Sequence, residues 1–182
     1  YLRKKRLDLE FETVEGLLEY CDKLGINNSL RAALDIAVTD AVCKMRGIHL
    51  YEYLGGKKRD YIKYDAGIPL TSLEESLYYV ERFHTNGVKR FKLKADKDIE
   101  NLIEKIRIIR EKYPDIEIKI DANSSWSMKN FKRALEYLER YNIFLVEDPV
   151  DLKNSNNLKT LEKLKSEISV PLMVDEALIS KE

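Results

Sequence analysis

The sequence of 182 residues predicts an α/β fold, and within that class part of a (β/α) barrel of the TIM type. From residue 61 onward, short apolar segments alternate with amphipathic helical segments. The ends of the apolar segments recur every 26 to 28 residues, which is about the length of one strand, one turn, one helix and one return loop. Alternation of this kind produces parallel strands joined by right-handed crossovers.

The predicted strands have one apolar face and one face that becomes charged toward the strand end. In residues 116–121, three isoleucines alternate with Glu117, Lys119 and Asp121. An open sheet covered by helices on both faces would be apolar throughout, so the alternation favours a barrel whose lumen holds the polar face. The face toward the helices is expected to hold Phe91, Leu93, the three isoleucines, Phe144 and Val146. The five strands are predicted to end near Ala66, Lys94, Asp121, Glu147 and Asp175.

The predicted helices begin at residues that commonly cap helices. Thr13 precedes the first helix, Gly25 ends it, and Ser72 with Glu75 forms a capping box before a later one. The predicted helical ranges are 13–24, 29–43, a short turn at 50–54, 72–85, 98–113, 128–141 and 156–168. The chain therefore divides into a helical region, 1–60, and the first five β/α units of a barrel, 61–182. A complete barrel needs roughly 250 residues.

The composition excludes several functional classes. Lys and Arg together number 32, as do Asp and Glu, so no global basic field would attract nucleic acid or an anionic membrane. No apolar run approaches the ~20 residues of a membrane span, and no signal peptide is visible, so we expect a cytoplasmic protein. Cys21 and Cys43 are expected to be buried, reduced thiols. For His49 and His84 we expect surface or helix-capping roles.

Carboxylates stand at the ends of three successive predicted strands. The C-terminal ends of parallel barrel strands converge on one site, and carboxylates are the ligands that a hard divalent ion prefers. Asp121, Glu147 and Asp175 therefore predict a Mg²⁺ site. A single carboxylate at a strand end is more often a helix cap or a solvated turn residue. Three of them, facing a Lys-x-Lys segment, favour the metal site.

Lys92 and Lys94 lie two residues apart on one strand, so both ammonium groups should point into the same lumen. Each is expected to lower the pKa of the other, which would allow one lysine to act as a base near neutral pH. A metal ion beside a base suggests removal of a proton next to a carboxylate, with the ion stabilising the resulting enediolate. Asp148 and Glu176 are expected to support the lysines or the metal ligands.

Four ordered motifs resemble the active-site series of the enolase superfamily, in its mandelate racemase and muconate lactonizing enzyme branch. The motifs are Lys92-Leu93-Lys94, Asp121-Ala122-Asn123 with Trp126, Val146-Glu147-Asp148-Pro149 and Val174-Asp175-Glu176. Residues 31–56 also resemble the segment that precedes the barrel in that branch, with Cys43 where Gly or Ala is commoner and His49 where Pro is usual.

The resemblance implies a role for each matched residue. Asp121, Glu147 and Asp175 would bind Mg²⁺, and Asn123 would support that site. Lys94 would be the general base, and Lys92 would contact the substrate carboxylate and lower the pKa of Lys94. Trp126 is expected to pack over the strand-to-helix turn.

The resemblance also implies a partial chain. Residues 1–60 would be the helical remainder of an N-terminal capping domain, whose sheet precedes this chain, and the strand that carries a second acid or base would follow residue 182. A dipeptide epimerase is the leading interpretation. An o-succinylbenzoate synthase, a lactonizing cycloisomerase, a sugar-acid dehydratase and a non-catalytic fragment remain alternatives. We expect a small-molecule carboxylate as binding partner, no nucleic acid or membrane, and a homo-oligomer.

Overall fold

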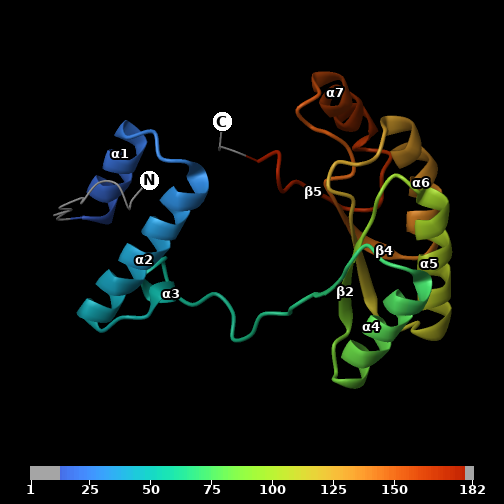
Figure 1. The fold of residues 1–182 in the computed structure, drawn as a ribbon, viewed down its shortest axis with the longest axis horizontal. Helices are drawn as coiled ribbons and strands as arrows, with labels where there is room; N and C mark the ends of the chain where they lie inside the picture. Colours follow the sequence, from blue (N-terminus) through green and yellow to red (C-terminus); the bar gives the residue numbers. More distant parts are fainter. Residues whose placement is uncertain (1–12, 179–182) are drawn as a thin grey trace. The chain divides into compact units, whose positions relative to one another are not determined.

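The computed structural model describes residues 13–178, which belong to two compact units with a boundary between Ile62 and Lys63 (Figure 1). This boundary lies two residues after the predicted one. Among the described residues, the first unit contains helices and no strand, and the second contains the sheet. Assignment of the first unit to a capping domain stays a prediction.

The described part of the first unit contains three helices, and their ends follow from local capping. They are α1 (Val14–Lys23), α2 (Asn28–Arg46) and the single turn α3 (Leu50–Tyr53). The Thr13 hydroxyl accepts the Gly16 N–H at 3.0 Å, and Gly47 ends α2 at a φ of 65°, a value that favours glycine. Cys21 and Cys43 are buried free thiols, as predicted.

The second unit is a five-stranded parallel sheet with the strand order β1-β2-β3-β4-β5. The strands are β1 (Ala66–Ile68), β2 (Arg90–Lys94), β3 (Glu117–Asp121), β4 (Ile143–Glu147) and β5 (Leu172–Met173). The helices are α4 (Leu73–Thr85), α5 (Ile99–Lys112), α6 (Met128–Arg140) and α7 (Ser155–Leu164). Each new strand adds to the same side of the sheet, whereas a doubly wound sheet reverses its strand order. This order confirms the predicted barrel-type α/β fold.

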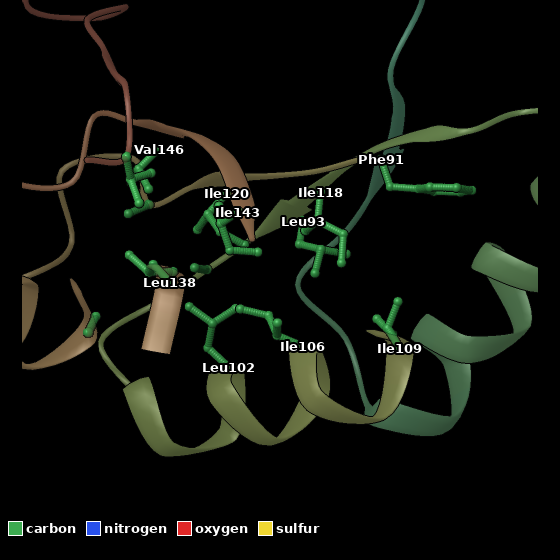
Figure 2. Close-up of a cluster of buried hydrophobic side chains, with 14 of the residues drawn as sticks. Phe91, Leu93, Leu102, Ile106, Ile109, Ile118, Ile120, Leu138, Ile143 and Val146 are labelled. Carbon is green, nitrogen blue, oxygen red and sulfur yellow. The ribbon is translucent and has the colours of Figure 1, made fainter. Parts of the chain in front are cut away.

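One face of the sheet forms the core with the helices (Figures 1 and 2). Phe91 and Leu93 of β2 alternate with half-buried lysines, and the apolar residues of β3 follow the same period. Figure 2 shows these side chains facing the buried side of α5. The labelled core residues are Phe91, Leu93, Leu102, Ile106, Ile109, Ile118, Ile120, Leu138, Ile143 and Val146. The opposite face carries the polar residues of the site.

The sequence-based prediction for Phe144 was wrong. The register between β3 and β4 shifts between Ile118 and Lys119, so β4 contains one extra residue there. Ile143 and Val146, three residues apart, therefore both enter the core. The Phe144 ring instead lies 4.7 Å below the Arg90 guanidinium, which comes from the polar series of β2.

Both edge strands have bounds that differ from the predicted ones. β1 begins at Ala66 instead of ending there, because residues 61–65 pair with no strand among the described residues. β5 contains only Leu172 and Met173, so it ends two residues before Asp175. An edge strand has one neighbour, and Pro171 before β5 has no N–H to donate. Helix α7 ends at Leu164, four residues before the predicted end.

The capping box of α4 gives a testable prediction. The Ser72 hydroxyl accepts the Glu75 N–H at 3.1 Å, and the Ser72 N–H donates to the Glu75 carboxylate at 3.3 Å. Replacing Ser72 with alanine should lower the free energy of unfolding by about 1 kcal/mol, because one backbone donor loses its acceptor. Denaturant titration measures this loss. Exposed Ser166 provides the control, since Ser166→Ala should change the value by less than about 0.5 kcal/mol.

Candidate active site

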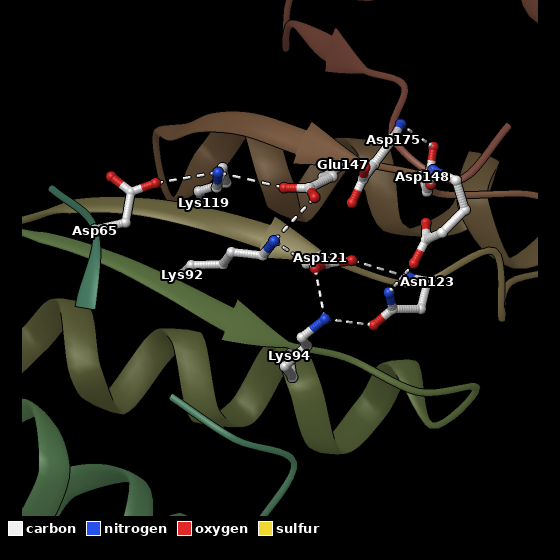
Figure 3. A network of polar contacts seen from close by, with 10 residues as sticks. Asp65, Lys92, Lys94, Lys119, Asp121, Asn123, Glu147, Asp148 and Asp175 are labelled. Carbon is white, nitrogen blue, oxygen red and sulfur yellow. Dashed lines mark hydrogen bonds and ion pairs between the residues drawn. The ribbon is translucent and has the colours of Figure 1, made fainter. Parts of the chain in front are cut away.

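Three adjacent strands bring the predicted lysines and carboxylates to one end of the sheet (Figure 3). Lys94, Asp121 and Glu147 are the last residues of β2, β3 and β4. The strand register pairs Lys94 with Asp121 and Asp121 with Glu147, so the three ends are level. Asp121 and Glu147 are each 1% exposed, and such burial of a carboxylate requires a partner.

The two lysines supply those partners. The Lys92 ammonium group donates to Asp121 Oδ2 at 2.6 Å and to Glu147 Oε1 at 2.9 Å. The Lys94 ammonium group donates to the same Asp121 oxygen at 2.7 Å and to Asn123 Oδ1 at 2.7 Å. One carboxylate oxygen is thus shared by both lysines, as the dashed lines in Figure 3 show.

These contacts shift the pKa values of the paired groups. Burial works against ionisation of Asp121, but the hydrogen bonds from Lys92 and Lys94 prevail and lower the pKa of its carboxyl. Burial likewise favours neutral Lys92, but hydrogen bonds to Asp121 and Glu147 prevail and raise its pKa. The prediction of a lowered pKa for Lys92 was therefore wrong for this arrangement, because its ammonium group donates hydrogen bonds to the Asp121 and Glu147 carboxylates.

Sequence reasoning missed the two ion pairs that Lys119 forms in this site. Lys119 lies on the polar face of β3, and its ammonium group is 3.0 Å from Asp65 Oδ2 and 3.3 Å from Glu147 Oε2. The alternation along β3 already placed Lys119 in the lumen. Asp65, however, stands just before β1 and carries no local signal of its role. Among the described residues, Glu147 Oε2 accepts no hydrogen bond although it is buried.

Asp148 and Glu176 also lie at this rim. The Asp148 carboxylate accepts the N–H groups of Asp175 and Glu176 at 3.0 and 2.9 Å, and the Asn123 amide donates to the Glu176 carboxylate at 2.7 Å. Burial opposes ionisation of Asp148, but hydrogen bonds from the Glu176 carboxyl and from both N–H groups lower its pKa. The structure thus places seven of the eight predicted site residues at the strand ends or after them, and the eighth, Lys92, in the middle of β2 with its ammonium group in contact with Asp121.

The predicted metal ligands are not gathered as a set of three. Within residues 13–178, no three Asp, Glu, His or Cys side chains are grouped in a way that could hold a metal ion. Asp121 and Glu147 are paired with lysines, and Asp175 is exposed beyond the end of β5. The assignment of Asp121, Glu147 and Asp175 as ligands stays a prediction.

The remaining predicted residues have structural roles. Trp126 is buried, and its indole N–H donates to the Asp96 carbonyl at 2.7 Å, so it packs over the turn as predicted. His49 precedes α3 as its N-cap, and the imidazole of His84 contacts the Lys89 ammonium group at 2.9 Å.

No helix in the described part of the chain is long and apolar enough to cross a membrane.

Comparison with known proteins places this site in context. The chain is 31% identical to the L-amino acid-D/L-Glu epimerase of Sulfurimonas denitrificans, over 96% of this chain and 50% of the relative. It is 29% identical to the o-succinylbenzoate synthase of Bacillus subtilis, over 85% of this chain and 40% of the relative. The chain therefore spans about half the length of the curated relatives that it matches.

Solved structures agree with the sequence comparison. The crystal structure of a dipeptide epimerase from Cytophaga hutchinsonii, in complex with Mg and the dipeptide D-Ala-L-Val, superposes with a TM-score of 0.80 at 31% identity. The match covers 90% of this chain and 44% of that structure. Residues 78–182, more than half of the chain, match the enolase C-terminal domain-like family. By its fold, its strand-end residues and this match, the chain belongs to the enolase C-terminal domain-like family.

Proposed function

We propose that this chain carries the active-site half of a Mg²⁺-dependent enzyme that removes a proton α to a carboxylate and passes through an enediolate. An epimerase of the dipeptide epimerase type is the function that we favour. The observation that carries this proposal is the position of Lys92 and Lys94, whose ammonium groups meet at the Asp121 carboxylate. Barrel enzymes have their active sites at the C-terminal ends of the parallel strands. In this chain, a pair of lysines lies beside buried carboxylates at that position.

The two lysines would have different roles. Lys94, the last residue of β2, would take the α-proton, while Lys92 would hold the substrate carboxylate by charge. Asn123 would keep Lys94 oriented, since its side-chain oxygen accepts a hydrogen bond from the Lys94 ammonium group. The ammonium groups contact the same carboxylate oxygen, so both lie at the same part of the rim.

The carboxylates at the rim have the chemistry that Mg²⁺ prefers, although the three predicted ligands are not gathered around one point in this structure. Asp121 and Glu147 are adjacent in register and provide oxygen ligands, and Asp175 follows the next strand. Glu147 Oε2 is buried and accepts no hydrogen bond among the described residues, and the Lys119 ammonium group lies 3.3 Å from it, so this oxygen already faces positive charge. When bound, Mg²⁺ supplies positive charge that stabilises negative charge on a substrate carboxylate. Asp121, Glu147 and Asp175 would hold it.

The proposed substrate class follows from the relatives. Epimerases of amino-acid derivatives match nearly the whole chain, and a crystallised dipeptide epimerase has a closely similar fold. An o-succinylbenzoate synthase is the second candidate, supported by the identity to the Bacillus subtilis enzyme. We also propose a cytoplasmic location, a homo-oligomeric assembly, and a small carboxylate as the binding partner in place of nucleic acid or membrane.

A titration with Mg²⁺ tests the metal site. Calorimetry on the 182-residue chain should detect one site. Asp121→Asn and Glu147→Gln should each weaken it by more than about 100-fold, because each removes a charged ligand.

Exposed Asp115, at the opposite end of β3, provides the control. Asp115→Asn should leave the affinity within about twofold, since its charge is distant from the site and screened by solvent. Unchanged binding in both ligand variants would remove the metal hypothesis and favour a non-catalytic module.

A further inference from the structure

Asp148 forms hydrogen bonds with strand β5 and with the turns that follow β3 and β5. Its carbonyl oxygen accepts the Ser124 N–H at 2.7 Å, and its own N–H donates to the Met173 carbonyl at 2.9 Å. Its two carboxylate oxygens accept the N–H groups of Asp175 at 3.0 Å and Glu176 at 2.9 Å. One residue therefore connects the turn after β3 and the turn after β5 to the end of β4.

The backbone at this point is in an unfavourable conformation. Asp148 has a φ of 39°, and Asn123 and Ser124 in the neighbouring turn have φ values of 43° and 59°. Residues with a Cβ rarely adopt such angles, and they keep them only where the surroundings impose them. The Asp148 side chain is 0% exposed, so its carboxylate depends on these protein donors instead of water. The backbone conformation and the burial together show that the surrounding structure holds the turn at Asp148 in place.

The turn after β5 needs such support. The ladder between β4 and β5 contains only Leu172 and Met173, so the backbone of Asp175 and Glu176 lies beyond it. Both of these residues are exposed, and the hydrophobic core does not hold them. Their N–H groups donate instead to the Asp148 carboxylate, and the Glu176 side chain accepts a hydrogen bond from Asn123.

We propose that Asp148 is a positioning residue, which fixes the turn after β5 through its two consecutive N–H groups and so determines where the Asp175 carboxylate lies relative to Asp121 and Glu147. This inference rests on the proposed function, because it assigns Asp148 a role toward the metal ligand Asp175. A purely structural role would stabilise the fold and leave the affinity for the ion unchanged. The two roles therefore differ in what they predict for binding.

Magnesium affinity distinguishes these roles. Asp148→Asn preserves the size of the side chain but replaces one acceptor oxygen by an NH₂ group, which would face an N–H donor. We expect the Kd for Mg²⁺ to rise 10- to 100-fold, measured by calorimetry at a temperature where circular dichroism shows each variant folded. The control is Asp151→Asn, because exposed Asp151 also accepts a backbone N–H, that of Lys153, at 2.9 Å. Its Kd should stay within about twofold of the parent value.

Amide hydrogen exchange tests the geometry without metal. In the parent chain, the N–H groups of Asp175 and Glu176 should exchange at least about tenfold more slowly than an open turn allows, since a buried carboxylate accepts both. Asp148→Asn should remove this protection while the Val146 amide, which donates to the Pro171 carbonyl, keeps its own. If Asp148→Asn does not fold, the parent chain alone still tests the proposal, because added Mg²⁺ should slow exchange of the Asp175 and Glu176 amides further.

The outcomes separate this inference from the proposed function. Lost protection with weakened Mg²⁺ binding supports the positioning role. Lost protection with an unchanged Kd shows that Asp148 is only structural, and unprotected Asp175 and Glu176 amides in the parent chain overturn the geometry itself. If the parent chain does not bind Mg²⁺ but its Asp175 and Glu176 amides are protected, the proposed function is refuted, and so is the role of Asp148 toward a metal ligand. The hydrogen bonds from Asp148 to the turn after β5 are then still supported.

Discussion

Replacing Lys94 with alanine in the complete protein should slow solvent exchange of the substrate α-proton by at least about 10²- to 10⁴-fold for one enantiomer, because the proposed general base is lost. Exchange from the opposite enantiomer should persist, since the resemblance to the superfamily implies a second base beyond residue 182. Lys92→Ala should slow both, because its proposed contact is to the carboxylate that both enantiomers share. Proton NMR in deuterated solvent measures each rate.

A charge-preserving variant makes this test sharper. Lys94→Arg keeps a cation that can donate to Asp121 and Asn123, but arginine is not deprotonated in proteins and cannot act as a base. Exchange of the α-proton in Lys94→Arg should therefore be as slow as in Lys94→Ala. Exposed Lys97 is the control, and Lys97→Ala should keep the parent rates. Recovery of exchange in Lys94→Arg, or equal loss for both enantiomers in Lys94→Ala, would show that the residue or the reaction is wrong.

Replacing Phe91 with alanine should lower the free energy of unfolding of the second unit by about 3 to 5 kcal/mol. Phe91 is 0% exposed, lies in β2, which has a neighbouring strand on each side, and faces the same core as Ile118 and Ile109 (Figure 2). Its removal leaves a cavity that rigid strands cannot close. The free energy of unfolding of a small domain is only about 5 to 15 kcal/mol, so the variant should lose a large part of its stability.

Denaturant unfolding followed by circular dichroism measures this loss. Tyr64 is an aromatic control from the same unit, because its side chain is 81% exposed. Tyr64→Ala should change the free energy of unfolding by less than about 0.5 kcal/mol. A loss below about 1 kcal/mol for Phe91→Ala would contradict the packing described for this face of the sheet.

Much of the fold could be predicted from the sequence where local signals agree. The bounds of β2 follow from Arg90 to Lys94 alone, since the alternation of charge and apolar residues extends over the whole strand. The start of α4 follows from Ser72 and Glu75, because a capping box acts within four residues. Parallel strands of similar length then bring Lys94 and Asp121 level, so the meeting of these residues was also predictable.

The rest depends on contacts that the sequence does not express locally. Asp65 and Lys119 form an ion pair across 54 positions of the chain, and neither lies in a recognisable motif. The extent of β5 depends on pairing with β4, so an apolar run alone gave too long a strand. The direction of the pKa shift of Lys92 depends on distances to two carboxylates, which spacing along β2 cannot provide.

The extra residue in β4 makes the length of that strand part of the active site. Without the register shift after Ile118, the residue opposite Asp121 would be Val146, and Glu147 would project toward the other face. A strand that kept all of its residues but paired regularly would therefore remove Glu147 from the rim as thoroughly as replacing it, although no functional residue would be altered. In evolutionary terms, the bulge has to be kept for as long as four residues precede Glu147 in β4.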